Sequence, residues 1–109
     1  MNKSVNKIEL RGYVGRDPQI NEIADAKVVR FSIATNETFK DKTGKLKEET
    51  TWHNIVAWNG KGMLDFQKIK KGSFIGVLGR VRESRYQTEA GEEKFYHDVL
   101  ANRITIEEG

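Results

Sequence analysis

The sequence predicts an all-β domain in which five strands close a small barrel, with one short helix between the third and fourth strands and long hairpin arms. Apolar and polar residues alternate with a period of two in five segments, as in strands with one buried face. Glycine-containing polar segments separate these strands, and only one segment shows helical spacing. With 109 residues and no cysteine, residues 1–109 are predicted to form one domain whose core needs no disulfide.

The first half of the chain predicts three strands and one arm. In residues 5–14 apolar side chains mostly alternate with polar ones and glycines mark a bend, which suits a curved first strand. Strict alternation in residues 29–34 predicts the second strand. The highly charged residues 39–50, centred on a Thr-Gly pair, predict a long hairpin arm that leads into a third strand at residues 50–58.

The second half predicts the helix and two more strands. Apolar residues at a spacing of three indicate a short amphipathic helix within residues 60–72. Alternation returns in residues 73–86 and 95–106, and the acidic, glycine-containing residues 87–94 between them predict a second hairpin tip. Three strands, a helix and two strands is the order of the OB-fold, a Greek-key barrel whose exposed sheet and loops bind oligonucleotides or oligosaccharides.

Charge is distributed unevenly along the chain. Nineteen basic and sixteen acidic residues give a net charge of only +3, but the segment from Lys61 to Arg85 holds seven basic and two acidic residues. A solvated basic face is one interpretation of this cluster, and an anionic partner is the other. No apolar segment is long enough to predict a signal peptide or a membrane span, so we expect a cytoplasmic protein with no membrane partner.

No catalytic constellation is visible, and we predict that the protein is not an enzyme. His97 and Asp98 are neighbours in a predicted strand, so they point to opposite faces and cannot share a metal ion. Residues 59–62 lack the spacing and the hydroxyl group of a phosphate-binding loop. The absence of cysteine excludes thiolate metal sites and cysteine nucleophiles. We therefore expect no metal and no cofactor.

Two tryptophans in the third predicted strand are the most informative residues. With a period of two, Trp52, Asn54, Val56 and Trp58 share one face of this strand. Two indoles with an amide between them suit a partly hydrated platform on which flat ligands stack. Because tryptophan is highly buried on average, the alternative is that both indoles belong to the core.

Aromatic residues interleaved with basic ones favour binding of single-stranded nucleic acid. Unpaired bases stack on aromatic rings, with roughly 1–3 kcal/mol per base and little dependence on sequence, while lysine and arginine neutralise phosphates. The chain supplies both kinds of side chain, in Phe39, Trp52, Trp58 and Tyr86 and in Lys42, Lys71, Arg80, Arg82 and Arg85.

Nearly the whole chain resembles the bacterial single-stranded DNA-binding proteins of the replication type. The resemblance is carried, in family order and spacing, by Val5-Asn6-Lys7, Gly12, Gly15, Asp17-Pro18, residues 31–39 (FSIATNETF), residues 50–58 (TTWHNIVAW), Lys71-Gly72-Ser73 and residues 79–86 (GRVRESRY). It implies sequence-independent binding of single-stranded DNA, which protects the strand in replication, recombination and repair.

The resemblance also implies which residues contact DNA. The four aromatic stacking positions of the family fall at Phe39, Trp52, Trp58 and Tyr86, although many relatives have tryptophan where this chain has Phe39 and Tyr86. The implied phosphate and polar contacts are Lys7, Lys42, Asn54, Lys71, Arg80, Arg82 and Arg85. Asn54 stands at a position that is often basic in the family.

The resemblance further implies a homo-oligomer, most often a tetramer, with a dimer as the alternative. Its interface would include Val5, Asn6 and His53. Relatives continue into a flexible linker and an acidic tip that recruits replication and repair proteins, whereas this sequence stops at Gly109. The family's acidic tail is therefore absent from it, through a cut or in a short paralogue, and such partners are expected only if the full-length protein has a tail.

Two other binding modules remain as alternatives. One is a primosomal replication protein, which is a related dimeric OB-fold, and the other is an RNA-binding OB module. The full set of four aromatic positions favours the single-stranded DNA-binding family, whose bacterial members are cytoplasmic and associated with the nucleoid.

Overall fold

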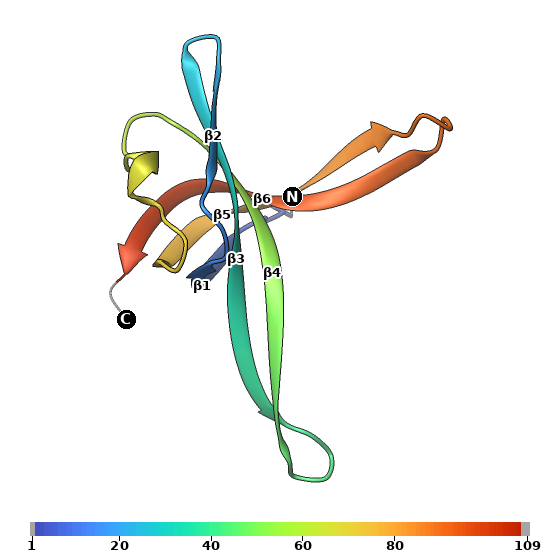
Figure 1. Cartoon of the computed structure of the whole chain (residues 1–109). Helices are drawn as coiled ribbons and strands as arrows, with labels where there is room; N and C mark the ends of the chain where they lie inside the picture. The colour runs from blue at the N-terminus through green and yellow to red at the C-terminus, as the bar shows by residue number, and fades with distance from the viewer. Residues whose placement is uncertain (1, 108–109) are drawn as a thin grey trace.

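The computed structural model describes residues 2–107, which form six strands and one short helical turn (Figure 1). Glu108 and Gly109, on which the expectation of a missing tail depends, lie outside the described residues. The elements in chain order are β1 (Ile8–Val14), β2 (Gln19–Ile23), β3 (Ala26–Lys40), β4 (Leu46–Trp58), the 3₁₀ turn η1 (Phe66–Lys68), β5 (Phe74–Gln87) and β6 (Glu93–Glu107).

Five of the strands close a barrel. They follow the order β1-β5-β6-β4-β3, and β1 closes the ring by also pairing with β3. All pairs are antiparallel except β4 with β6, which is parallel. Inward-facing aliphatic side chains fill the barrel, with Ile33, Ile55 and Ile75 fully buried. The OB-fold predicted from the sequence is confirmed.

The first strand changes partner at a glycine. β1 pairs with β5 from Ile8 to Tyr13 and with β3 from Tyr13 onward. A Cβ atom on Gly12 would collide with the carbonyl oxygen of Ala34, so only glycine allows this close approach. The strand begins at Ile8 rather than at Val5, because the residues before Ile8 have no strand partner.

Both of the predicted hairpin arms extend from the barrel, and the hairpin of β2 with the beginning of β3 projects from it as well (Figure 1). The first is the far end of β3 and β4, whose pairing continues without a break to Lys40 and Leu46. Its tip is held by Asp41, whose carboxylate accepts hydrogen bonds from the hydroxyl of Thr43 at 2.6 Å and from two backbone N–H groups. These bonds, the Thr43 hydroxyl first, lower the pKa of Asp41. The second arm is the far end of β5 and β6, which pair up to Gln87 and Glu93.

The helix predicted over residues 60–72 is reduced to the single turn η1. Gly62 has a φ of +86°, and Asp65 and Ile69 at the two ends of the turn are extended. The positive φ of Gly62 and the extended residues at both ends of the turn interrupt the helix on either side. The two apolar residues at a spacing of three, Phe66 and Ile69, are buried in the core and anchor the connection between β4 and β5.

One strand was not predicted. β2 pairs with the beginning of β3, and all five of its residues are exposed. A strand without a buried face has no alternation of apolar and polar residues to reveal it.

Candidate nucleic-acid interface

Both tryptophans of β4 lie on the outer side of the barrel. Trp52 is 60% exposed and Trp58 is 40% exposed, whereas Ile55 and Ala57 on the other face of the strand belong to the core. Val56, between the two indoles, is buried but lies outside the core cluster. The alternative that both tryptophans are core residues is therefore wrong, and they form an exposed platform.

A glycine makes room for the first indole. A Cβ atom on Gly15 would lie 2.7 Å from Cη2 of Trp52 and closer still to Cζ3. One edge of the ring thus rests against the backbone at Gly15, while the rest of the ring is open to solvent. This contact restricts the rotamers of an exposed side chain.

Replacing Gly15 with alanine is expected to turn the Trp52 ring outward and to lower the free energy of unfolding by about 1 kcal/mol. In a Trp58→Phe background Trp52 is the only indole, so its fluorescence emission should shift to longer wavelength. Gly60→Ala is the matched control, because nothing lies within 4 Å of a Cβ atom added there. Unchanged emission for Gly15→Ala would mean that the ring does not rest on Gly15.

The strand register places side chains from four strands on the face that carries the tryptophans. Ser32 pairs with Asn54, Val56 with Leu100, and Arg82 with Asp98. Directly paired residues share a face, so the even-numbered residues of β3, β4, the arm half of β5 (Arg80 onward) and the arm half of β6 (up to Leu100) continue one surface around the barrel. We call this surface the groove face; its members include Arg30, Ser32, Trp52, Asn54, Val56, Trp58, Arg80, Arg82, Ser84, Tyr86, Tyr96 and Asp98.

A groove runs across this face. Its lining includes Arg30, Ser32 and Asn54 from β3 and β4, Tyr96 and Asp98 from β6, and Arg16 and Asp17 from the segment between β1 and β2. A second hollow, lined in part by Trp52, shares Arg16 and Ser32 with the groove, so the two lie next to each other. Together they bring an indole close to two arginines and polar side chains, a combination that suits a flat, anionic ligand.

Arg82 does not face the groove as a free cation. Its Nε and Nη2 donate to the two carboxylate oxygens of Asp98 at 2.8 and 3.1 Å, and the Asp98 side chain is only 4% exposed. This bidentate hydrogen bond raises the pKa of Arg82 above the ordinary value of an arginine. The ion pair neutralises a buried carboxylate beside the groove, and the phosphate contact of Arg82 stays a prediction.

The other predicted residues of β5 separate onto two faces, because neighbouring residues of a strand point to opposite sides. Arg80 and Tyr86 are exposed on the groove face, and Tyr86 lies beside Tyr96, with ring centroids 6.0 Å apart. Arg85 is on the opposite face, where its guanidinium lies 5.3 Å from the centre of the Phe95 ring. Arg85 and Tyr86 therefore cannot contact the same nucleotide from one side of the arm.

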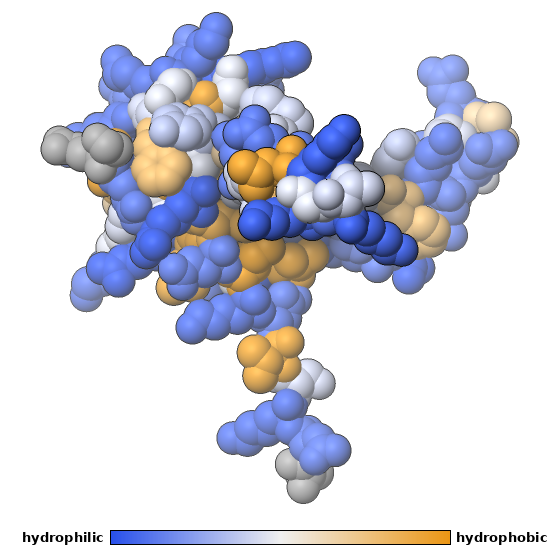
Figure 2. Space-filling view, turned by 90° about the horizontal axis from the view of Figure 1, so that it is seen from below, coloured by the Kyte–Doolittle hydropathy of each residue, from blue (hydrophilic) through white to orange (hydrophobic). Residues whose placement is uncertain are grey.

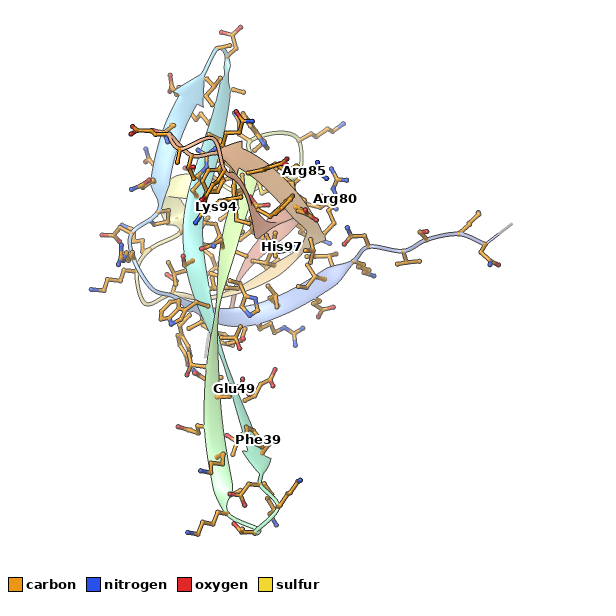
Figure 3. The ribbon with its side chains drawn as sticks, turned by 90° about the vertical axis from the view of Figure 1, so that its right-hand side faces the viewer. Phe39, Glu49, Arg80, Arg85, Lys94 and His97 are labelled. Atoms are coloured by element: carbon orange, nitrogen blue, oxygen red, sulfur yellow. The ribbon has the colours of Figure 1, made fainter. Side chains whose placement is uncertain are left out.

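Phe39 is separated from the tryptophans. It is exposed on the β3–β4 arm, well away from the barrel (Figure 3). It pairs with Lys47, whereas Trp52 pairs with Ala34, so the odd-numbered Phe39 lies on the other side of this ribbon. Lys42 is exposed in the tip of the same arm. A ligand that contacts Phe39 and the groove face must follow the arm around its twist.

The remaining predicted residues lie around the barrel. Lys7 and Lys71 are exposed outside the strands, and the backbone N–H of Lys71 donates to Asp17 at 3.1 Å. His53 Nε2 is 2.9 Å from the hydroxyl of Thr35 on the face opposite Trp52.

The N-terminal segment is held by one side chain. The Asn6 amide donates to the carbonyl oxygen of Val81 and accepts from its N–H, which extends the β1–β5 pairing by one side-chain link. Val5, beside it, is almost fully exposed. Figure 2 shows that the segments projecting from the body of the molecule are mostly hydrophilic, with isolated hydrophobic groups on them.

Sequence reasoning missed Arg16, Arg30 and Tyr96 in the groove. Arg30 could have been found, since it alternates with the core residues Val29 and Phe31 and so shares the face of Trp52. Arg16 and Tyr96 reach the groove only through tertiary structure. Within residues 2–107 no cluster of three potential metal ligands is present, and no helix is long and apolar enough to cross a membrane.

Comparison with known proteins decides the family. The model of the single-strand binding protein family matches residues 5–106. The chain belongs to this family. The resemblance inferred from the sequence motifs is thereby confirmed.

Family members of known sequence extend beyond the matched region. The single-stranded DNA-binding proteins of two Neisseria meningitidis strains are 36% identical over 104 residues, which cover 94% of this chain and 60% of each relative. Single-stranded DNA-binding protein 1 of Chlorobaculum tepidum is 36% identical over 108 residues, which cover 97% of this chain and 67% of the relative. The chain thus spans about 60% of the length of the Neisseria relatives.

Solved structures of family members have the same fold. The Plasmodium falciparum SSB in complex with ssDNA matches with a TM-score of 0.82 and 30% identity, covering 99% of this chain and 100% of that one. A deletion mutant of the single-stranded DNA binding protein from Thermus aquaticus matches with a TM-score of 0.81 over 96% of this chain and 51% of that one. At 23% identity, the second likeness shows the fold alone.

Proposed function

We propose that this domain binds single-stranded DNA without sequence preference and has no catalytic role. The observation that carries the proposal is the pair of exposed indoles on the groove face, with a groove lined by Arg16 and Arg30 beside them. Membership of the single-strand binding protein family supports it, as does the 30% identity to a relative described as a complex with ssDNA.

The physical chemistry of the groove face favours a single strand over a duplex. An unpaired base exposes both of its faces to an indole, whereas a base inside a duplex is already stacked on both sides. Every base has such a face, so stacking gives affinity without sequence readout. The arginines add a term that depends on phosphate charge and on salt, and this term is also independent of sequence.

We assign roles according to where each side chain lies. Trp52, Trp58 and Tyr86 stack bases on the groove face, and Phe39 stacks a base on the arm. Arg16, Arg30 and Arg80 meet phosphates along the groove face, joined by Asn54 as a polar contact. A basic surface beyond the groove face is formed by Lys7, Lys42, Lys71 and Arg85. The main role of Arg82 is its ion pair with Asp98.

We also propose that the domain acts as a homo-oligomer, a tetramer in the first instance, with Val5, Asn6 and His53 at its contacts. Val5 is almost fully exposed, and Asn6 fixes the segment that carries it along β5. An exposed segment that has no strand partner and carries an exposed apolar side chain suits pairing with a second copy. In such an assembly a single strand would pass over several groove faces and be protected during replication, recombination and repair in the bacterial nucleoid.

The test is a fluorescence titration with oligothymidine and with a duplex of equal length. Oligothymidine is expected to quench the emission of Trp52 and Trp58, because each stacked base contacts an indole directly. The logarithm of the binding constant should fall linearly with the logarithm of the salt concentration, by roughly 0.7 per phosphate contact. An oligouridine of the same length compares DNA with RNA in the same assay.

Equal quenching by the duplex would contradict the platform described above. A binding constant that does not change with salt would mean that the basic residues do not contact phosphates. Stronger binding of oligouridine than of oligothymidine would favour an RNA-binding module instead.

A further inference from the structure

Tyr96 is an exposed aromatic side chain on the groove face to which none of the roles above applies. It lies on β6 opposite Ser84 and is 47% exposed. Its side chain lines the groove across from Ser32 and Asn54. The parallel pairing of Ile55 with Val99 and of Val56 with Leu100 puts it on the same side of the sheet as Trp52.

The surroundings of Tyr96 match those of a stacking residue. The Tyr86 ring is inclined to it by 52°, with centroids 6.0 Å apart, so the two rings meet at an angle and leave about half of each exposed. Asp98, two residues along the strand, is neutralised by Arg82, so the carboxylate beside the ring does not repel a phosphate. Arg30 faces the same groove from β3.

The position of Tyr96 also fills a gap between the assigned residues. Trp52 lies on β4 in the hollow next to the groove, and Tyr86 lies on the β5–β6 arm. Tyr96 lies beside Tyr86 and lines the groove that adjoins the hollow of Trp52. A single-stranded DNA that passes from the barrel onto the arm would otherwise meet no aromatic ring between these residues.

We propose that Tyr96 is a further base-binding residue, which stacks an unpaired nucleobase where the bound single-stranded DNA passes from the groove onto the β5–β6 arm. This inference rests on the proposed function. A structural role is the competing explanation, in which Tyr96 only packs against Tyr86 and holds the arm in shape. The two roles differ in what they require, since stacking needs an aromatic face and packing needs only apolar volume.

The test measures oligothymidine affinity for three variants of Tyr96. Tyr96→Ala and Tyr96→Leu are both expected to lower the affinity about 5- to 100-fold, since both remove the aromatic face, while Tyr96→Phe should stay within about twofold of the unmodified chain. With an abasic strand of equal length, which has phosphates and no bases, all three should bind as the unmodified chain does. Thermal unfolding checks that each variant is folded.

Phe95→Ala is the matched control, because Phe95 is the adjacent aromatic residue, is 52% exposed and lies on the opposite face of the arm beneath Arg85. Its affinity for oligothymidine should change less than about twofold. Full affinity of Tyr96→Leu would overturn the inference, because the side chain would then act through packing alone. An equal loss for Phe95→Ala would also overturn it, since the arm as a whole would then be responsible.

Trp52→Ala in the same assay separates this inference from the proposed function. If Trp52→Ala binds oligothymidine more weakly and the Tyr96 variants bind normally, only the role of Tyr96 is wrong. If the unmodified chain fails to bind oligothymidine, the proposed function falls, and the role of Tyr96 falls with it.

Discussion

Replacing both Trp52 and Trp58 with alanine is expected to weaken the binding of oligothymidine by at least about 30-fold, with the fold retained. Each stacked base contributes roughly 1–3 kcal/mol, and tenfold in affinity corresponds to about 1.4 kcal/mol. Six residues of extended strand put the two side chains about 20 Å apart, so they hold different bases and their contributions should add. Both indoles are exposed, and the core packs on the other face of β4.

Isothermal titration of the double variant, with thermal unfolding in parallel, checks this result. The matched control is the double Trp→Phe variant, which keeps an aromatic face at each position and should recover most of the affinity. A double alanine variant that binds normally would remove the indoles from the interface. One that is unfolded would mean that the indoles support the barrel despite their exposure.

The barrel could be predicted from the sequence because its strands are amphipathic. Alternation in β3, β4, β5 and β6 identified which residues face the core, and the order of the elements left few topologies. β2 could not be found in this way, since all five of its residues are exposed. The spacing of Phe66 and Ile69 correctly marked buried anchors, but a spacing of three does not distinguish a helix from one 3₁₀ turn between extended residues.

The part of the candidate site that lies on the single strand β4 could be predicted from the sequence. Trp52, Asn54 and Trp58 share a face through local periodicity alone, and the structure keeps them together. The position of Tyr96 depends on the parallel pairing of β4 with β6, between segments about 40 residues apart, and no local pattern encodes that register. The same limit applies to Arg80 and Arg82, which alternate identically in the sequence and differ only in what lies opposite them on β6.

Replacing Arg82 with alanine is expected to destabilise the domain by roughly 2–3 kcal/mol. The substitution leaves the Asp98 carboxylate buried with neither of its two bonds from the guanidinium. Losing one partner of a fully buried pair costs roughly 3–5 kcal/mol, and the Arg82 side chain is 35% exposed, so water offsets part of the penalty. For a domain of this size the melting temperature should fall by about 10 °C or more.

Arg85→Ala is the matched control on the same strand. Its ion pair with Glu93 is longer, at 3.7 Å, and both side chains are more than half exposed, so its loss should cost less than about 1 kcal/mol. Adding Asp98→Asn to Arg82→Ala should recover part of the stability, because a neutral amide replaces the unpaired charge. If Arg82→Ala and Arg85→Ala melt at the same temperature, Arg82 does not act through Asp98, and a direct phosphate contact becomes the better account of its place on the groove face.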